Sequence, residues 1–225
     1  MLEVTREAFG APVEIEFAVD LTKDDNDKAS FYLLQVKPLV GSGAGYSIDP
    51  ESVSSEDMVL ISKKSMGNGL VEDITDLIYV EPDKFDNLKT AEMAEEIEAI
   101  NRKMMLESRR YVLIGPGRWG TKDRFLGIPV AWPQISNARV IVEVGLPNFR
   151  LDASQGSHFF HNVTSMNIGY LSVNEDAGEG IIMWKRLREQ TVVSNGRFFT
   201  HIRFEKPLVI RMDGQVGMTV ISFSS

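Results

Sequence analysis

Short apolar segments with the two-residue period of β-strands recur along this chain, whereas only one segment has the period of an α-helix. The segment Val13–Val19 begins with alternating apolar and acidic residues, as expected for a strand with one buried face. Further strands are predicted at Phe31–Val36, Val59–Ile61, Leu77–Val80, Tyr111–Ile114, Val140–Val144 and Ile168–Val173. We therefore expect an α+β fold with a mixed, mainly antiparallel sheet and one long helix.

The predicted helix covers Thr90–Arg109. Thr90 is a candidate N-cap, and two arginines lie at the other end, where cations suit the helix dipole. Apolar side chains recur at helical spacing at Met93, Ile97, Ile100 and Met104. Because methionine fills irregular gaps in protein cores, this stripe predicts core packing.

Two later segments complete the pattern of predicted elements. The tail Phe198–Phe223 alternates apolar and polar residues around Pro207 and Asp213-Gly214, which predicts a terminal hairpin. The segment Ile181–Arg188 is compatible with either a helix or a strand.

A segment rich in Ser and Gly, Gly41–Asp57, separates two apolar regions of the chain. Such a composition is typical of a linker or an extended surface loop. We place a domain boundary there, with a terminal hairpin in residues 1–41 and an accessory α+β domain in residues 42–225.

The composition excludes several classes of function. The chain has 225 residues, no cysteine and a formal net charge of -8. The lack of cysteine excludes disulfides and zinc sites built on sulfur, and it is compatible with the cytoplasm, where we expect the protein. The acidic excess disfavours nucleic acid and anionic membranes as partners, so we expect any bound phosphate to be held by a local cluster of side chains.

Two segments near the beginning of the chain carry a resemblance to a known family. Gly10–Phe17 reads GAPVEIEF, and Tyr32–Pro38 reads YLLQVKP after a variable polar run. This order resembles the end of the nucleotide-binding domain in the phosphoenolpyruvate synthase and pyruvate phosphate dikinase family, where an acidic strand is followed by Leu-Gln-x-Arg-Pro. The resemblance implies the terminal β-hairpin of an ATP-grasp site, with ATP and Mg²⁺ as cofactors.

The resemblance also implies roles for three residues. In that family the strand Glu binds magnesium, the Gln lies beside the metal and phosphates, and the Arg contacts the terminal phosphate; the matching positions are Glu16, Gln35 and Lys37. The departure is Lys37, because lysine keeps a point charge but lacks the planar fork of arginine. From the residues alone, the alternative is a cross-strand ion pair between Glu16 and Lys37 on a solvated face.

The resemblance covers roughly the first 40 residues well. The remaining sequence lacks the glycine-rich and basic segments that would hold adenine and the inner phosphates, the phosphohistidine motif and the pyruvate-binding barrel of the family. We therefore expect a C-terminal fragment of an ATP-dependent phosphotransferase that is not active alone. Its expected partners are the rest of the nucleotide domain and a nucleotide or phosphorylated small molecule.

The segment Gly115–Gly120, followed by Thr121 and Lys122, superficially matches a phosphate-binding loop. The final pair of that motif is reversed here, and the nearby Gly127 and Pro129 argue against the helix that should follow. Two interpretations remain for this turn. It is either an anion-binding nest of backbone amides with Arg118 as the cation, or a tight turn with Trp119 packed over it.

A second cluster lies in Asp152–Asn162. His158 and His161 would share one face of a helical turn and could hold a metal ion with Asp152. The alternatives are a packed core histidine and an anion site built from Ser154, Ser157 and exposed amides. Both Gly115–Gly120 and Ser154–Phe160 are similar to segments at the C-terminal end of large bacterial proteins labelled as phosphoenolpyruvate synthases.

Two functional hypotheses follow. The first is a phosphotransferase fragment in which the hairpin contributes Mg-ATP phosphate contacts. The second is a non-catalytic module that binds a small anion or assembles subunits, with Arg118 and His158 as its main residues.

Overall fold

The computed structural model describes residues 2–9, 13–23, 28–38, 47–48, 56–121, 123, 125–146, 149 and 168–224. The chain divides into two compact units, Met1–Gly41 and Ser42–Ser225. The division falls where the sequence changes to the Ser- and Gly-rich segment.

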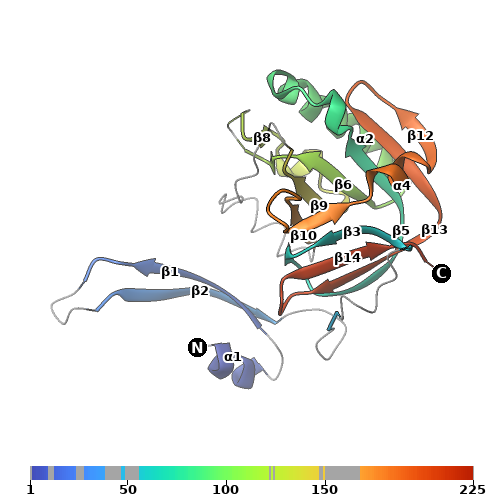
Figure 1. Cartoon of the computed structure of the whole chain (residues 1–225). Coiled ribbons are helices and arrows are strands. Elements are labelled where there is room, and N and C mark those ends of the chain that lie inside the picture. The colour runs from blue at the N-terminus through green and yellow to red at the C-terminus, as the bar shows by residue number, and fades with distance from the viewer. Residues whose placement is uncertain are drawn as a thin grey trace. The chain divides into compact units, whose positions relative to one another are not determined.

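The small unit consists of one short helix and a β-hairpin (Figure 1). Helix α1 covers Leu2–Phe9, and the strands β1, Val13–Asp20, and β2, Ser30–Pro38, pair in antiparallel fashion. The hairpin therefore forms where the alternating pattern predicts it.

The large unit is built around a ten-stranded mixed sheet with the strand order β11-β3-β14-β13-β5-β6-β9-β10-β4, and β12 pairs with β13. The strand bounds are β3 Met58–Ser62, β4 Lys64–Met66, β5 Gly69–Val80, β6 Tyr111–Pro116, β9 Ala138–Val144, β10 Gly169–Val173, β11 Gly180–Ile182, β12 Thr191–Asn195, β13 Phe199–Asp213 and β14 Met218–Ser222. The neighbours β5, β6, β9 and β10 run parallel, and the other pairs are antiparallel. The fold is thus α+β, as predicted.

The remaining elements connect the strands of the large sheet. They are the 3₁₀ turns η2 Pro82–Lys84, η3 Asn87–Lys89 and η4 Trp132–Gln134, the helices α2 Thr90–Leu106 and α4 Trp184–Arg188, and a separate parallel pair, β7 Arg118–Trp119 with β8 Gly127–Ile128. None of the helices in the described part of the chain is long and apolar enough to cross a membrane.

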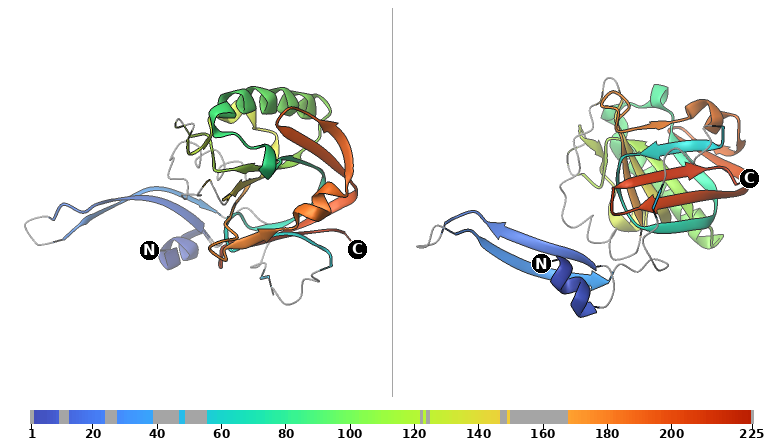
Figure 2. Two further views of the ribbon diagram at one scale, coloured as in Figure 1. Left: turned by 45° about the horizontal axis from the view of Figure 1, so that its top comes forward. Right: turned by 60° about the horizontal axis from the view of Figure 1, so that its bottom comes forward.

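The large sheet curls until its two ends approach each other (Figure 2). Ser62, at the end of β3, donates its hydroxyl to the carbonyl oxygen of Ser172 on β10 at 2.7 Å. Ser65 on β4 donates its amide to the carbonyl of Gly217, beside β14, at 2.9 Å. Since β4 also pairs with β10, the passage from β3 to β4 joins the two ends of the sheet.

The curl creates two hydrophobic clusters, one on each face of the sheet. The first brings together strands from both ends of the sheet, including Val59 and Leu60 of β3 with Val142 of β9 and Leu171 of β10. The second lies under α2, where Met93, Ile97 and Met104 are fully buried. The predicted methionine stripe is therefore core, and each such side chain contributes about 1.5–3 kcal/mol by burial.

The long helix begins at the predicted Thr90 but ends three residues before the predicted Arg109. Thr90 is the first helical residue rather than the N-cap, because a 3₁₀ turn capped by Asp86 precedes it. At the other end, the amides of Ser108 and Arg109 donate to the carbonyls of Met105 and Met104. This Schellman-type arrangement, with Ser108 at φ 53°, ends the helix at Leu106.

The two later segments also have definite structures. The ambiguous segment is both a strand and a helix, since β11 ends at Ile182 and α4 begins at Trp184. The tail forms the hairpin β13–β14 around Gly214–Gly217, as predicted. Pro207 lies within β13, where the pairing with β5 is interrupted between Arg203 and Leu208.

Candidate functional site

The hairpin of the small unit brings two of its predicted site residues together. In the strand register, Glu16 lies directly opposite Gln35, and Lys37 is two residues further along β2. Opposite residues in an antiparallel pair project from the same face, as do residues two apart on one strand. Glu16, Gln35 and Lys37 therefore share one face of the hairpin.

A β-bulge keeps the two faces of the hairpin distinct. The register shifts between Glu16 and Phe17, so that Leu34 is an extra residue on β2. Beyond it, Phe17 lies opposite Leu33 and Ala18 lies opposite Tyr32. Because of this extra residue, apolar side chains continue on one face and polar positions on the other.

The apolar face of the hairpin is largely uncovered. Phe17 and Phe31 stack with ring centroids 4.9 Å apart, yet both side chains are about half exposed. Val19, Leu33 and Leu34 are exposed as well. A two-stranded hairpin with such a face depends on further packing for its stability.

The polar face carries one carboxylate at the predicted magnesium position. Glu16 is exposed, whereas Gln35 and Lys37 are half-buried. Among the described residues, no three His, Asp or Glu side chains are grouped so that they could hold a metal ion. Mg²⁺ is commonly bound by one or two carboxylates together with phosphate oxygens and water, so Glu16 fits a shared rather than a complete ligand set.

The glycine-rich turn of the large unit does not form an anion-binding nest. Its successive amides already donate hydrogen bonds within the protein, namely Gly117 to the Val144 carbonyl at 2.9 Å, Arg118 to the Leu126 carbonyl at 2.8 Å, Trp119 to Glu143 Oε1 at 3.0 Å and Gly120 to the Ile128 carbonyl at 3.0 Å. No amide of this series is left for an anion, and the nest interpretation was wrong.

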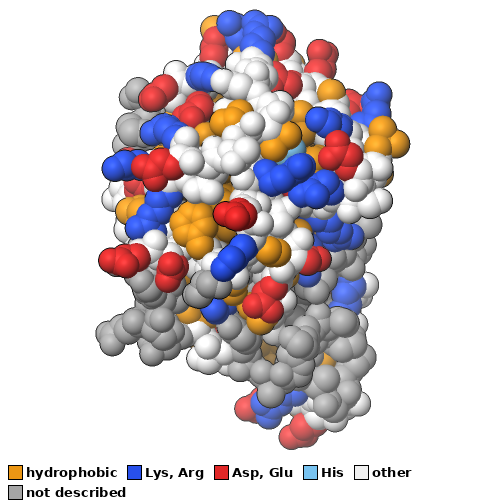
Figure 3. Space-filling model, turned by 90° about the vertical axis from the view of Figure 1, so that its right-hand side faces the viewer, with side chains coloured by type: hydrophobic (Ala, Val, Ile, Leu, Met, Phe, Trp, Pro, Cys, Tyr) orange, Lys and Arg blue, Asp and Glu red, His pale blue; other side chains and the backbone are white. Residues whose placement is uncertain are grey.

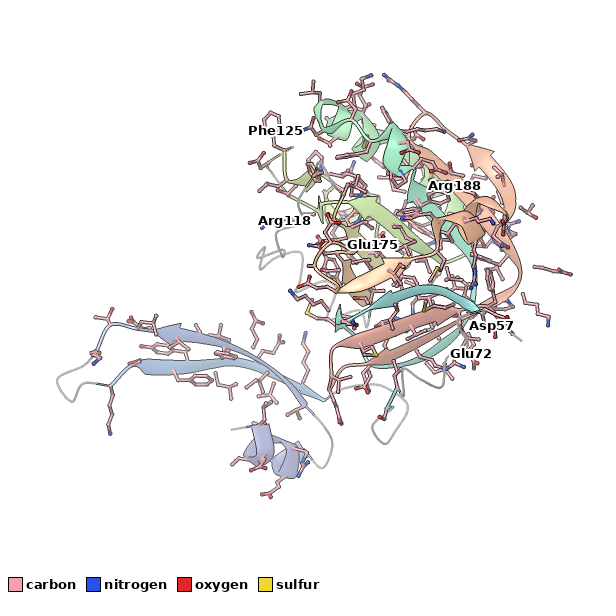
Figure 4. The ribbon with its side chains drawn as sticks, in the orientation of Figure 1. Asp57, Glu72, Arg118, Phe125, Glu175 and Arg188 are labelled. Carbon is pink, nitrogen blue, oxygen red and sulfur yellow. The ribbon has the colours of Figure 1, made fainter. Side chains whose placement is uncertain are left out.

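The alternative interpretation, a tight turn under Trp119, is confirmed. Trp119 is buried, and its indole Nε1 donates to the carbonyl of Val142 at 3.1 Å. A Cβ on Gly115 would come within 2.3 Å of the Trp119 ring, so only glycine fits there. The turn leads into the short pair β7–β8 and not into a helix, which agrees with the rejection of a phosphate-binding loop. Figure 4 shows Arg118 near β8, on the opposite side of the large unit from Arg188.

A buried carboxylate lies behind this turn. Glu143 on β9 is fully buried, and its Oε1 accepts hydrogen bonds from the Trp119 amide and the Tyr170 hydroxyl. Its Oε2 is buried without a hydrogen-bond partner among the described residues. Burial raises the pKa of Glu143 to about 7, although these hydrogen bonds and the charge of Arg118 oppose the shift.

A second buried carboxylate, Asp76 on β5, is surrounded by cations. Its Oδ1 accepts from His201 Nε2 at 2.8 Å and from Arg203 Nε at 2.9 Å. Its Oδ2 accepts from Arg109 Nε at 2.9 Å and from the Thr75 hydroxyl at 3.0 Å. Burial alone would raise the pKa of Asp76, but these donors outweigh it and hold the pKa well below its usual range.

The predicted site around His158 lies outside the described residues. The same holds for His161, Asp152, Ser154 and Ser157, so neither the metal nor the anion interpretation of that cluster is tested.

Sequence reasoning missed Glu143 and the Asp76 cluster. A charged residue inside the apolar run Val140–Val144 was the available signal for Glu143. The cluster had a weaker signal, because Asp76 and His201 each lie in an apolar strand segment but are 125 residues apart.

The chain was also compared with known proteins. No family model, no curated protein and no solved structure matches it.

Proposed function

We propose that the hairpin supplies the magnesium- and phosphate-facing strands of an ATP-grasp site in an ATP-dependent phosphotransferase of the phosphoenolpyruvate synthase and pyruvate phosphate dikinase type. The observation that supports the proposal is the pairing of Glu16 with Gln35, with Lys37 two residues further on the same face. These are the three positions to which the family resemblance assigns roles.

The chemistry of each side chain suits its proposed role. Glu16 would share Mg²⁺ with phosphate oxygens of ATP. Gln35, directly opposite, would donate its amide to a phosphate oxygen, and Lys37 would neutralise the terminal phosphate. Positioning and charge neutralisation are most of what phosphoryl transfer requires from a protein.

The uncovered apolar face of the hairpin suits a site that is completed by other parts of a nucleotide domain. The proposed partners are therefore the remainder of that domain and the nucleotide itself, in a cytoplasmic protein. Residues 42–225 would form an accessory domain, and this chain alone would bind nucleotide weakly.

Calorimetric titration with Mg-ATP tests the proposal on the natural polypeptide that contains these residues and the rest of its nucleotide domain. Glu16→Ala is expected to weaken Mg-ATP binding about tenfold or more, as for the loss of an interaction with a charged group. Glu7→Ala, at an exposed position of α1, is the matched control and should bind like the wild type. Equal affinity and equal ATP turnover in wild type and Glu16→Ala would overturn the assignment.

Lys37→Arg sharpens the same test. Arginine restores the planar fork that the family pattern usually has, so tighter phosphate positioning and faster ATP turnover are expected. Unchanged turnover on this substitution would mean that Lys37 does not contact the transferred phosphate.

The second hypothesis, a small-anion module, is supported by a different part of the large unit from the one that the sequence indicated. The turn at Arg118 offers no amides for an anion. The two arginines that contact Asp76, Arg109 and Arg203, offer a better arrangement for binding an anion.

A further inference from the structure

One buried carboxylate holds two arginines side by side at the amino-terminal end of β6. Asp76 is 1% exposed, and it accepts hydrogen bonds from Nε of both Arg109 and Arg203 at 2.9 Å. Arg109 Nη2 also donates to the hydroxyl of Thr75 at 2.6 Å. Because both guanidinium groups contact the same carboxylate, they are neighbours in fixed orientations.

These two arginines also reach the surface. Their side chains are 34% and 37% exposed, whereas Asp76 and His201 beneath them are buried. Within the described residues, no hydrogen bond involves Nη1 of Arg109 or Arg203. Each guanidinium is thus anchored through Nε and retains donors on its outer side.

A second acidic residue lies near the pair. Glu107 approaches Arg203 Nη2 at 4.0 Å. The two arginines therefore face two acidic residues, Asp76 and Glu107, in a chain whose overall charge is -8. Figure 3 shows Lys and Arg side chains gathered beside a His side chain on one face of the molecule.

We propose that Arg109 and Arg203 form a binding site for a small oxyanion, with the phosphate group of a small molecule as the best fit. Two guanidinium groups in fixed orientations suit a tetrahedral dianion. Arg203 can donate two parallel hydrogen bonds from Nη1 and Nη2, whereas Arg109, whose Nη2 already donates to Asp76 and Thr75, can donate from Nη1. Asp76 is the positioning residue, since it holds both groups without contacting the ligand. The proposal goes beyond the nucleotide site of the hairpin, because it uses no residue of the small unit.

Titration of the full chain with inorganic phosphate at constant ionic strength tests this site. The signals to follow are the arginine Nε–Hε resonances of the wild-type protein, with acetate and chloride as comparison anions. We expect saturable shifts of the Arg109 and Arg203 resonances with phosphate, weaker shifts with acetate and none with chloride. Equal shifts with all three anions, or shifts confined to other arginines, would overturn the proposal.

Substitutions provide a second, independent measurement by calorimetry. Arg203→Gln is expected to weaken phosphate binding about tenfold or more, because a charge-assisted interaction is lost. Arg203→Lys should give an intermediate affinity, since it keeps the charge but loses the fork. Arg197→Gln, which changes an exposed arginine paired with Glu92, is the matched control and should leave the affinity unchanged. Unchanged phosphate affinity in the folded Arg203→Gln protein would contradict the assignment.

Discussion

Two of the carboxylates buried in the large sheet, Asp76 and Glu143, have opposite pKa shifts. Asp76 receives hydrogen bonds from two arginines, a histidine and a hydroxyl, and its pKa is held well below its usual range. Glu143 receives one amide and one hydroxyl donor on a single oxygen, and its pKa is raised to about 7. Burial acts in the same direction on both groups, so the number and charge of the donors decide which carboxylate stays ionised.

The largest effect is expected for Asp76→Asn. The substitution leaves two guanidinium groups without their counter-charge and turns an amide NH₂ towards their donors, so a loss of about 3–5 kcal/mol in the free energy of unfolding is expected. Urea denaturation at pH 7 measures it. A loss below about 1 kcal/mol would show that water stabilises the two charged guanidinium groups when the carboxylate is removed.

The free energy of unfolding measured at acidic pH provides the control for this prediction. The pKa of Asp76 is lowered in the folded state from its usual value of 3.8, so its contribution to stability is present above pH 3.8 and is lost as the pH falls below it. The stability difference between wild type and Asp76→Asn should therefore shrink at low pH.

The next effect concerns Glu143, for which the dependence of stability on pH has the opposite sign. Its folded pKa of about 7 lies above the usual value of 4.5, so the folded state binds more protons and wild-type stability should fall as the pH rises from 4.5 to 7. The loss amounts to about 3 kcal/mol across that interval. In Glu143→Gln, which keeps an acceptor for Trp119 and Tyr170, this part of the pH dependence should disappear. Parallel stability curves for the two proteins would contradict the raised pKa.

A smaller effect is expected for Tyr170→Phe. The ionised Glu143 would lose one of its two donors, which should cost about 1–3 kcal/mol at pH 8 and less at pH 5, where the carboxyl group is protonated. Thermal denaturation at both pH values measures the difference. Tyr32→Phe, at an exposed position, is the matched control and should change stability by less than about 0.5 kcal/mol. An equal loss at pH 5 and pH 8 would mean that the hydroxyl does not respond to the charge of Glu143.

The smallest effect is expected for an ion pair at the surface. Glu92 and Arg197 contact each other with both side chains about half exposed. Glu92→Gln should cost about 0–1 kcal/mol, and less at high salt. If it cost as much as Asp76→Asn, burial would not be what distinguishes the two acidic residues.

Much of the fold followed from hydrophobic periodicity. The strand that begins at Val13, the strand that begins at Tyr111 and the long helix were predicted close to their observed bounds, because each carries a clear apolar pattern in the sequence. The short strands β4, β7 and β8 were missed, since a segment of two or three residues is too short to show a hydrophobic period. The strand β5 begins eight residues before the predicted Leu77, because its first half is only partly buried.

The candidate sites were harder to predict for a different reason. Glu16, Gln35 and Lys37 lie within one hairpin, so local pairing was enough to bring Glu16 opposite Gln35. The Asp76 cluster depends on β5 pairing with β13, more than a hundred residues later. No local pattern specifies such a pairing, and the end of the helix before Arg109 is also needed to turn that side chain towards β5.

The extra residue at Leu34 constrains how this chain can vary among its relatives. The segment between Asp20 and Ser30 can lengthen or shorten without changing which side chains share a face, because it lies beyond the last paired residues. Deleting Leu34 would make the ladder regular and keep Gln35 opposite Glu16 and Leu33 opposite Phe17. Deleting one of the paired residues would instead exchange the two faces on one side of the deletion. Insertions and deletions should therefore accumulate in the loop, and within β2 the loss of Leu34 is the change that the two faces tolerate.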